Sequence, residues 1–146
     1  MGRPVHFIRV STFFHRETLF KQSYSSIWFN ALASGISKTN EPCATSAVWA
    51  AGLSYALAVL WTYTPARRPS RTLIDPLSAF TDTFADSLDL MAAVSEATEA
   101  MEQTKNLQAK AGRAAYIEQK ELAKAQVPDP GACGVVKILE GLLYAL

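Results

Sequence analysis

The amino-acid sequence predicts an all-α fold, a bundle of about five or six helices. Apolar residues recur at helical spacing over most of the chain, and helix-starting and helix-ending residues separate these segments. No stretch keeps the alternation of a half-buried strand. The chain has 146 residues, of which 49% are hydrophobic and 18% charged, so it can bury one core.

The start of the chain differs from the rest. Residues 1–23 show no convincing helical or strand period, so we expect an unrelated or poorly ordered N-terminal segment there. The first predicted helix covers residues 25–36, with Ile27 and Ala31 on one face. Gly35 and the polar residues after it are expected to end this helix.

The second predicted helix is strongly apolar, starts at a capping Thr45 or Ser46 and runs to about Thr62. Residues 47–63 carry no charge, and a run of this length lies at the short end for a membrane span. Many of these residues are Ala or Gly, which suit close packing in a bundle. We therefore favour a core helix and do not expect a membrane partner.

Two further helices are predicted after a proline-containing loop at residues 64–70. An apolar stripe indicates the first of them, and it consists of Leu73, Leu77, Phe80, Phe84 and Leu88. Asp86 or Ser87 is expected to start the second, which should continue to about Lys110 until Gly112 stops it. Residues 116–124 are predicted to form a short turn or helix.

The last predicted helix follows a sharp break at residues 127–131. Asp129 is well placed as its N-cap and Pro130 as its first residue. The apolar residues that follow predict a mostly buried helix to the C-terminal end.

Charge and cysteine content limit the functions to consider. Residues 1–74 hold eight Lys/Arg and two acids, whereas residues 75–146 hold six Lys/Arg and eleven acids. The basic residues are scattered over loops, so we expect no nucleic-acid partner. Cys43 and Cys133 belong to no Cys-x-x-Cys pair, which argues against a zinc site. With no secretory signal at the start, the chain is predicted to be cytoplasmic.

Four stretches carry recognisable motifs, in a fixed order. Residues 26–36 read SIWFNALASGI, residues 63–77 read YTPARRPSRTLIDPL, residues 111–116 read AGRAAY and residues 128–132 read PDPGA. They resemble the DhaL-type nucleotide-binding domain of dihydroxyacetone (glycerone) kinases, and are closest to the fungal enzymes. The resemblance covers residues 24–146.

The resemblance implies a fold and an activity. The family domain is an antiparallel α-helical barrel that binds ATP at one end, with Mg²⁺ held by the aspartates of an Asp-Gly-Asp motif. The parent enzymes of glycerol metabolism transfer phosphate from ATP to dihydroxyacetone, which is bound covalently to a histidine of a separate domain. Such a transfer depends mostly on positioning and on charge neutralisation.

The motifs also imply nucleotide-binding residues. The matching positions are Arg71, Thr72, Gly112, Arg113, Asp129, Pro130 and Gly131. Each has a structural alternative: Thr72 as a helix cap with a solvated Arg71, Gly112 as a C-cap, and Asp129 as an N-cap. We expect Asp75 to be structural, paired with Arg71.

The sequence also departs from the family. Pro69 and Ser70 stand where the family has Gly and Asp, and no Asp precedes Asp75, so the Asp-Gly-Asp motif is missing. The glycine-rich phosphate loop would fall near residues 19–22, and nothing there resembles it. The sequence therefore predicts no catalytic or metal-binding residue, and an N-terminally truncated or degenerate domain that is inactive alone and binds nucleotide weakly.

A second hypothesis remains open. A barrel that lacks its first helices exposes an apolar seam, which would favour a non-catalytic module that forms a homodimer or docks on a full-length kinase.

Overall fold

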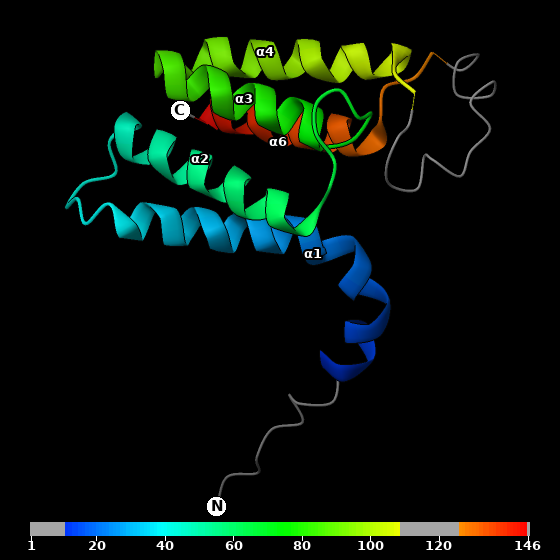
Figure 1. The fold of residues 1–146 in the computed structure, drawn as a ribbon, viewed down its shortest axis with the longest axis horizontal. Coiled ribbons are helices and arrows are strands. Elements are labelled where there is room, and N and C mark those ends of the chain that lie inside the picture. The colour runs from blue at the N-terminus through cyan, green and yellow to red at the C-terminus, as the bar shows by residue number, and fades with distance from the viewer. Residues whose placement is uncertain (1–10, 109–125, 146) are drawn as a thin grey trace, which may run out of the picture.

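The computed structural model describes residues 11–108 and 126–145, and their side chains from residue 24 onward. This part of the chain consists of five α-helices and one 3₁₀ turn, with no strand among the described residues (Figure 1). The all-α prediction is confirmed.

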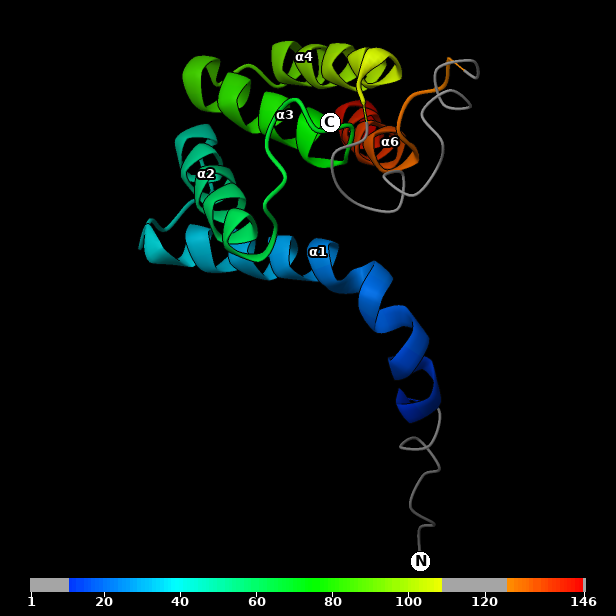
Figure 2. The same cartoon turned by 45° about the vertical axis from the view of Figure 1, so that its right-hand side comes forward.

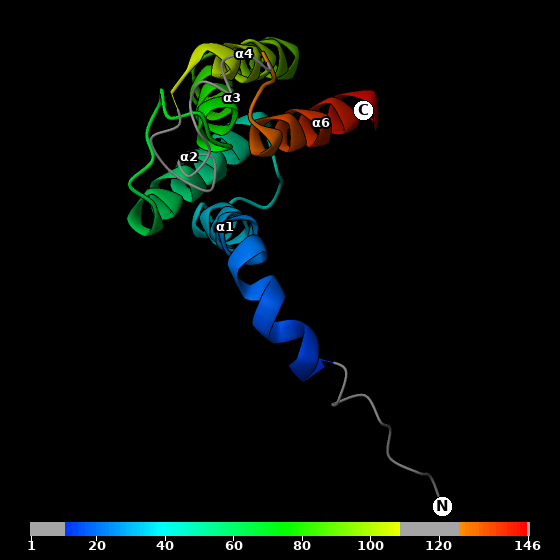
Figure 3. The ribbon, with the colours of Figure 1, turned by 90° about the vertical axis from the view of Figure 1, so that its right-hand side faces the viewer.

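The helices form two groups. One is a hairpin of α1 (Ser11–Lys38) and α2 (Ser46–Tyr63). The other contains α3 (Ile74–Ser87), α4 (Leu90–Gln103) and α6 (Pro130–Ala145). Consecutive helices run antiparallel along the bundle (Figure 1). The first half of α1 extends away from the other helices, as Figures 2 and 3 show.

The first helix is longer than predicted at both ends. It begins at Ser11, so the predicted start at residue 25 is wrong. Gly35 does not end it, because the helix continues to Lys38, but the polar stretch at residues 37–42 does end it, as predicted. A Cβ on Gly35 would lie 3.0 Å from the Cα of Gly52, so the glycine permits close contact between α1 and α2.

The second helix starts as predicted. The hydroxyl of Thr45 accepts a hydrogen bond from Val48 N at 3.4 Å. By length and composition α2 could cross a membrane, with a mean hydropathy of 1.2. Seven of its residues are buried inside the fold, and they include Gly52, Ala56 and Leu60. Small residues therefore bring this helix close to its neighbours.

The boundary between α3 and α4 lies later than predicted. Helix α3 ends where Leu88 adopts a left-handed conformation with φ of 56°. Asp89 then caps α4, accepting from Met91 N at 2.9 Å and Ala92 N at 3.1 Å. The expected caps, Asp86 and Ser87, are wrong, because they still belong to the last turn of α3.

The end of α4 also differs from the prediction. It stops at Gln103 and not near Lys110, and a 3₁₀ turn, η1 (Thr104–Asn106), follows. The predicted stop at Gly112 and the predicted turn or helix at residues 116–124 lie outside the described residues. Helix α4 therefore ends earlier than its helix-favouring composition suggests.

Small residues on α4 and α6 let the second group pack closely. Ala93, Ala97 and Ala132 are fully buried, beside the stacked rings of Phe80 and Phe84. The predicted start of the last helix is confirmed, since Pro130 is its first residue. This packing fixes the first turn of α6 beside the first turn of α3 and the end of α4, where the predicted site residues gather.

Candidate functional site

The candidate site lies at one end of the bundle, where three distant segments meet. They are the loop before α3, the η1 turn after α4 and the first turn of α6 (Figure 1). Hydrogen bonds from side chains to the main chain join these segments. We refer to Arg71, Asp75, Thr104 and Asp129, which make most of these bonds, as the end cluster.

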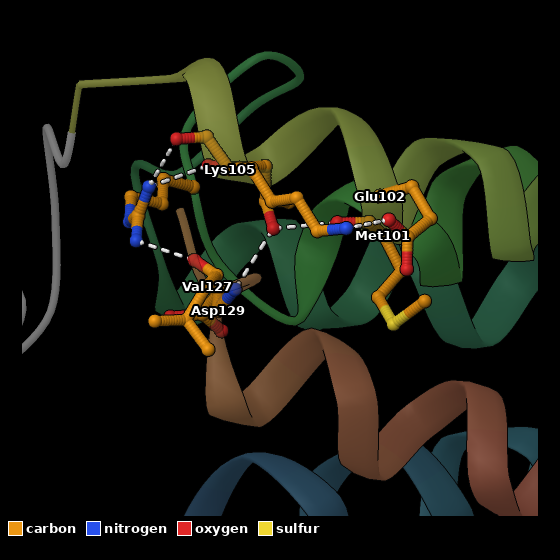
Figure 4. Close-up of polar contacts among 7 residues, drawn as sticks. Met101, Glu102, Lys105, Val127 and Asp129 are labelled. Atoms are coloured by element: carbon orange, nitrogen blue, oxygen red, sulfur yellow. Dashed lines mark hydrogen bonds and ion pairs between the residues drawn. The ribbon is translucent and has the colours of Figure 1, made fainter. Parts of the chain in front are cut away.

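Arg71 joins all three segments. Its Nη1 atom donates to the main-chain oxygens of Thr104 at 2.6 Å, Lys105 at 3.1 Å and Leu107 at 3.2 Å. Its Nη2 atom donates to the oxygen of Val127 at 2.9 Å. Figure 4 shows Lys105 and Val127, two of the residues that supply these acceptors, with the Lys105 side chain directed toward Glu102.

Arg71 is therefore buried, with 3% of its surface exposed, and the alternative of a solvated Arg71 is wrong. Its backbone φ of 56° lies in the left-handed region, which directs the side chain inward from the loop. Within the described part of the chain, main-chain carbonyl dipoles, and not a direct carboxylate partner, compensate the guanidinium charge.

Asp75 organises the loop before α3. Its carboxylate accepts from Ser70 N at 2.9 Å, from Thr72 N at 2.7 Å and from the Ser70 hydroxyl at 3.2 Å. Its expected structural role is confirmed. The expected partner is wrong, because these three bonds come from Ser70 and Thr72, while Arg71 turns to the carbonyls of the other segments.

Thr72 lies at the entry to α3. Its hydroxyl accepts from Ile74 N at 3.2 Å and bonds with the Ser70 hydroxyl at 2.8 Å. Thr72 is not the cap of this helix, because the N-cap is Leu73 and has no side-chain cap bond. The half-buried Thr72 side chain lies at the surface of the cluster. A nucleotide role for Thr72 stays a prediction.

Asp129 caps α6, as predicted. Its Oδ2 accepts from Ala132 N at 2.9 Å, and its own backbone N donates to the Thr104 hydroxyl at 2.8 Å. Burial raises the pKa of this carboxyl above its ordinary value of 3.8. Backbone hydrogen bonds from Ala132 and Gly131 and the charge of Arg71 oppose that rise in pKa, whereas Asp75 adds to it.

Gly131 brings the Asp129 turn, residues 129–131, against the start of α3. A Cβ at this position would lie 3.0 Å from Asp129 Oδ2 and 3.4 Å from Leu73 Cβ. A larger side chain would separate the two segments. Pro130 and Gly131 remain exposed, so the first turn of α6 is open to solvent. The structure thus brings together the Arg71–Thr72 and Asp129–Gly131 motifs, whereas Gly112 and Arg113 lie outside the described residues.

Thr104 belongs to this site although no sequence motif pointed to it. It is fully buried, its hydroxyl donates to Met101 O at 2.6 Å, and it accepts from Asp129 N. A buried threonine in a polar stretch beyond an apolar helix is not distinctive in a single sequence. Only the approach of α6 to the end of α4 gives its hydroxyl a partner.

The described residues do not fit a Mg²⁺ ion. None of them form a group of three or more His, Cys, Asp or Glu side chains that could hold a metal. The two carboxylates of the end cluster accept from backbone N–H groups, as capping carboxylates do. Mg²⁺ requires oxygen ligands in near-octahedral geometry, which this arrangement does not supply.

Comparison with known families places this geometry in context. The family model of the DAK2 domain matches residues 24–144, which include the loop before α3, the end of α4 and the Asp129 turn. The chain belongs to the DAK2-domain family. The match begins at Tyr24, within α1, and covers every helix that follows.

Individual relatives of this DAK2 domain are kinases. Dihydroxyacetone kinase 2 of Saccharomyces cerevisiae is 35% identical over 82% of the chain and 21% of its own length. Dihydroxyacetone kinase of Pichia angusta is 42% identical over 69% of the chain and 17% of its own length. Human triokinase/FMN cyclase is 36% identical over 67% of the chain and 18% of its own length.

The chain thus spans about a fifth of the length of these relatives. No solved structure matches it. Family membership is therefore shown for the domain, and the activity of the longer proteins is a separate question.

Proposed function

We propose that this chain is a fragment or degenerate form of the DhaL-type, ATP-binding domain of a dihydroxyacetone kinase, N-terminally truncated and inactive alone. One observation carries the proposal. Two motif segments more than fifty residues apart, around Arg71 and around Asp129, lie against each other at one end of the bundle. This is the arrangement expected if both line one ligand site.

The exposed first turn of α6 supplies the chemistry for a weak nucleotide site. The N-terminus of a helix carries a partial positive charge, which favours phosphate, while Asp129 already pairs the N–H groups of Gly131 and Ala132. Pro130 and Gly131 leave this turn open, and Thr72 lies on the adjoining segment. Gly112 and Arg113 complete the proposed site by family resemblance. Arg71 contributes indirectly, because its hydrogen bonds hold the main chain at Thr104 and Val127.

Catalysis is not expected of this chain. Phosphoryl transfer needs metal ions that neutralise charge developing on the phosphate, and their loss removes several kcal/mol of transition-state stabilisation. No Asp precedes Asp75, so the metal-binding motif of the family is missing from the chain.

A phosphoryl-transfer assay tests this proposal. The purified chain is incubated with ATP, Mg²⁺ and dihydroxyacetone, and ADP is measured, with the Pichia angusta kinase as positive control. We expect background ADP formation from the chain. Turnover above background would refute the claim of inactivity.

A groove between α1 and α2 supports a second function, a non-catalytic interaction module. The groove has a volume of about 360 Å³, and its lining includes Ile27, Asn30 and Ala31 of α1 and Tyr55, Val59 and Tyr63 of α2. Such a surface suits a protein partner, and we expect a second copy of the chain or a full-length kinase in the cytoplasm to bind it, and expect neither nucleic acid nor a membrane there.

Size-exclusion chromatography with light scattering tests whether the chain acts as an interaction module. The interaction module predicts a dimer, or a complex with an added full-length kinase, that Tyr63→Lys weakens. A clean monomer that binds neither would refute it. Asp129→Ala serves as the control, because it lies in the other group of helices and should leave association unchanged.

A further inference from the structure

Thr104 is placed between two elements that the sequence separates by 25 positions. Its hydroxyl donates to Met101 O at 2.6 Å, within the last turns of α4. The same oxygen accepts from Asp129 N at 2.8 Å, at the start of α6. Because a hydroxyl has one proton, the direction of both bonds is fixed. Thr104 therefore ties the Asp129 turn to the end of α4.

Arg71 makes a second connection beside that of Thr104. Its guanidinium donates to the main-chain oxygens of Thr104, Lys105 and Leu107 through Nη1 and to that of Val127 through Nη2. Arg71 thus connects Val127, just before α6, to the η1 turn and Leu107 after α4.

We propose that Thr104 is a positioning residue for the Asp129 turn and that, with Arg71, it forms a lock that holds this turn against the η1 turn and the loop before α3. The inference rests on the proposed function, since it assigns residues that position the proposed nucleotide site. Neither residue needs to touch the ligand. Each acts through the main chain, Thr104 through Asp129 N and Arg71 through Val127 O.

The lock predicts a specific chemical effect on Asp129. The carboxylate caps α6 from a buried position because the turn is held against η1 and α3. Without the Thr104 hydroxyl, Asp129 N loses its buried acceptor, and the turn should move outward to find water. The carboxyl would then be better hydrated, so its pKa would fall toward the ordinary value.

The test uses the full chain and two matched variants. Thr104→Val keeps the shape of the side chain but removes the hydroxyl, and Thr104→Ser keeps the hydroxyl. NMR titration of the Asp129 carboxyl is expected to give a lower pKa in Thr104→Val than in the unmodified chain, and an unchanged pKa in Thr104→Ser. An unchanged pKa in all three would overturn the lock, whatever the change in stability.

Hydrogen exchange of the unmodified chain tests the same bond if Thr104→Val does not fold. The Asp129 amide is expected to exchange as slowly as core amides of α6 such as that of Val136. Exchange as fast as that of an exposed, uncapped helix start would contradict the lock.

Nucleotide titration separates the lock from the proposed function. If the unmodified chain binds ATP, Thr104→Val should weaken binding by about fivefold, the value of one lost hydrogen bond, and Thr104→Ser should not. Equal affinity in all three would overturn the positioning role. If the unmodified chain binds no ATP, the proposed function fails, while the Asp129 pKa and amide exchange still decide whether the lock exists.

Discussion

The α1–α2 hairpin and the end cluster are held together by different physics. In the hairpin, two glycines bring helices into contact: a Cβ on Gly35 or Gly52 would lie 3.0 Å or less from atoms of the facing helix. In the end cluster, buried side chains bond to main-chain groups of other segments. Packing of small residues gives a shape, whereas the polar cluster gives a fixed arrangement of the chain around an exposed helix start.

The difference has a consequence for mutation. Dispersion contacts are individually weak, so a packed interface loses stability gradually as it is altered. A buried polar network leaves unpaired groups when one member is removed, and the cost is concentrated in a single residue. The two regions should therefore respond differently to single substitutions.

Arg71→Met should have the largest effect. It removes four hydrogen bonds, and the main-chain oxygens left without a donor cost roughly 1–3 kcal/mol each where they stay buried. We expect the free energy of unfolding to fall by about 3 kcal/mol or more, measured by urea denaturation. Arg68→Met is the matched control, because Arg68 is exposed and should change stability by less than about 0.5 kcal/mol. A similar loss in both variants would contradict the role of Arg71.

Gly52→Leu should have the next largest effect. Even its Cβ would lie 2.7 Å from Ile36 Cγ1, so the helices must separate, at a cost of about 1–3 kcal/mol. Gly141→Leu is the control, because a Cβ there meets nothing within 4 Å, and removing an exposed helical glycine should stabilise by about 0.5–1 kcal/mol. Thermal unfolding of both variants checks the opposite signs. A loss of stability in both, or in neither, would mean that the hairpin contact is not as close as described.

Asp129→Ala should cost about 1 kcal/mol, the usual value of an N-cap, while Asp129→Asn should retain most of the cap. Urea denaturation at neutral pH measures both. Equal losses in the two variants would show that the carboxylate charge, and not its capping oxygen, holds the turn.

The effect of pH on the stability of Asp129→Asn should be smaller than the effects above, and it has a predicted sign. Burial raises the pKa of Asp129 in the folded chain, so its contribution to stability is full below the ordinary pKa of 3.8 and is lost as the pH rises through the folded pKa. Asparagine does not ionise. The stability of Asp129→Asn relative to the unmodified chain should therefore increase with pH across this window, as followed by denaturation at a series of pH values. A relative stability that is constant or falls would contradict the burial of the carboxylate.

The sequence predicted the hairpin and the end cluster to different extents. The periodicity of apolar residues predicted every described α-helix except the first half of α1. Asp129 was assigned correctly as a cap, and Thr45 was one of the two caps expected for α2. Gly35 was misread as a helix end, because a glycine that ends a helix and one that lets two helices touch have the same local pattern. Only the partner, Gly52, distinguishes the two uses.

In the end cluster, motifs identified Arg71 and Asp129 but not what they contact. The acceptors of Arg71 are main-chain oxygens, which carry no sequence signal. Thr104 was missed for the same reason, since its partner is a backbone N–H. Side-chain bonds to distant main chain depend on how the helices pack, and a single sequence does not reveal them.

We propose that the Asp129 turn is the part of this chain that binds nucleotide. Amide NMR of the labelled chain during titration with ATP and Mg²⁺ tests this proposal most directly. We expect chemical-shift changes at Gly131, Ala132 and Thr72 and none along the α1–α2 groove. Shifts confined to the groove, or none at the turn at saturating ATP, would contradict it.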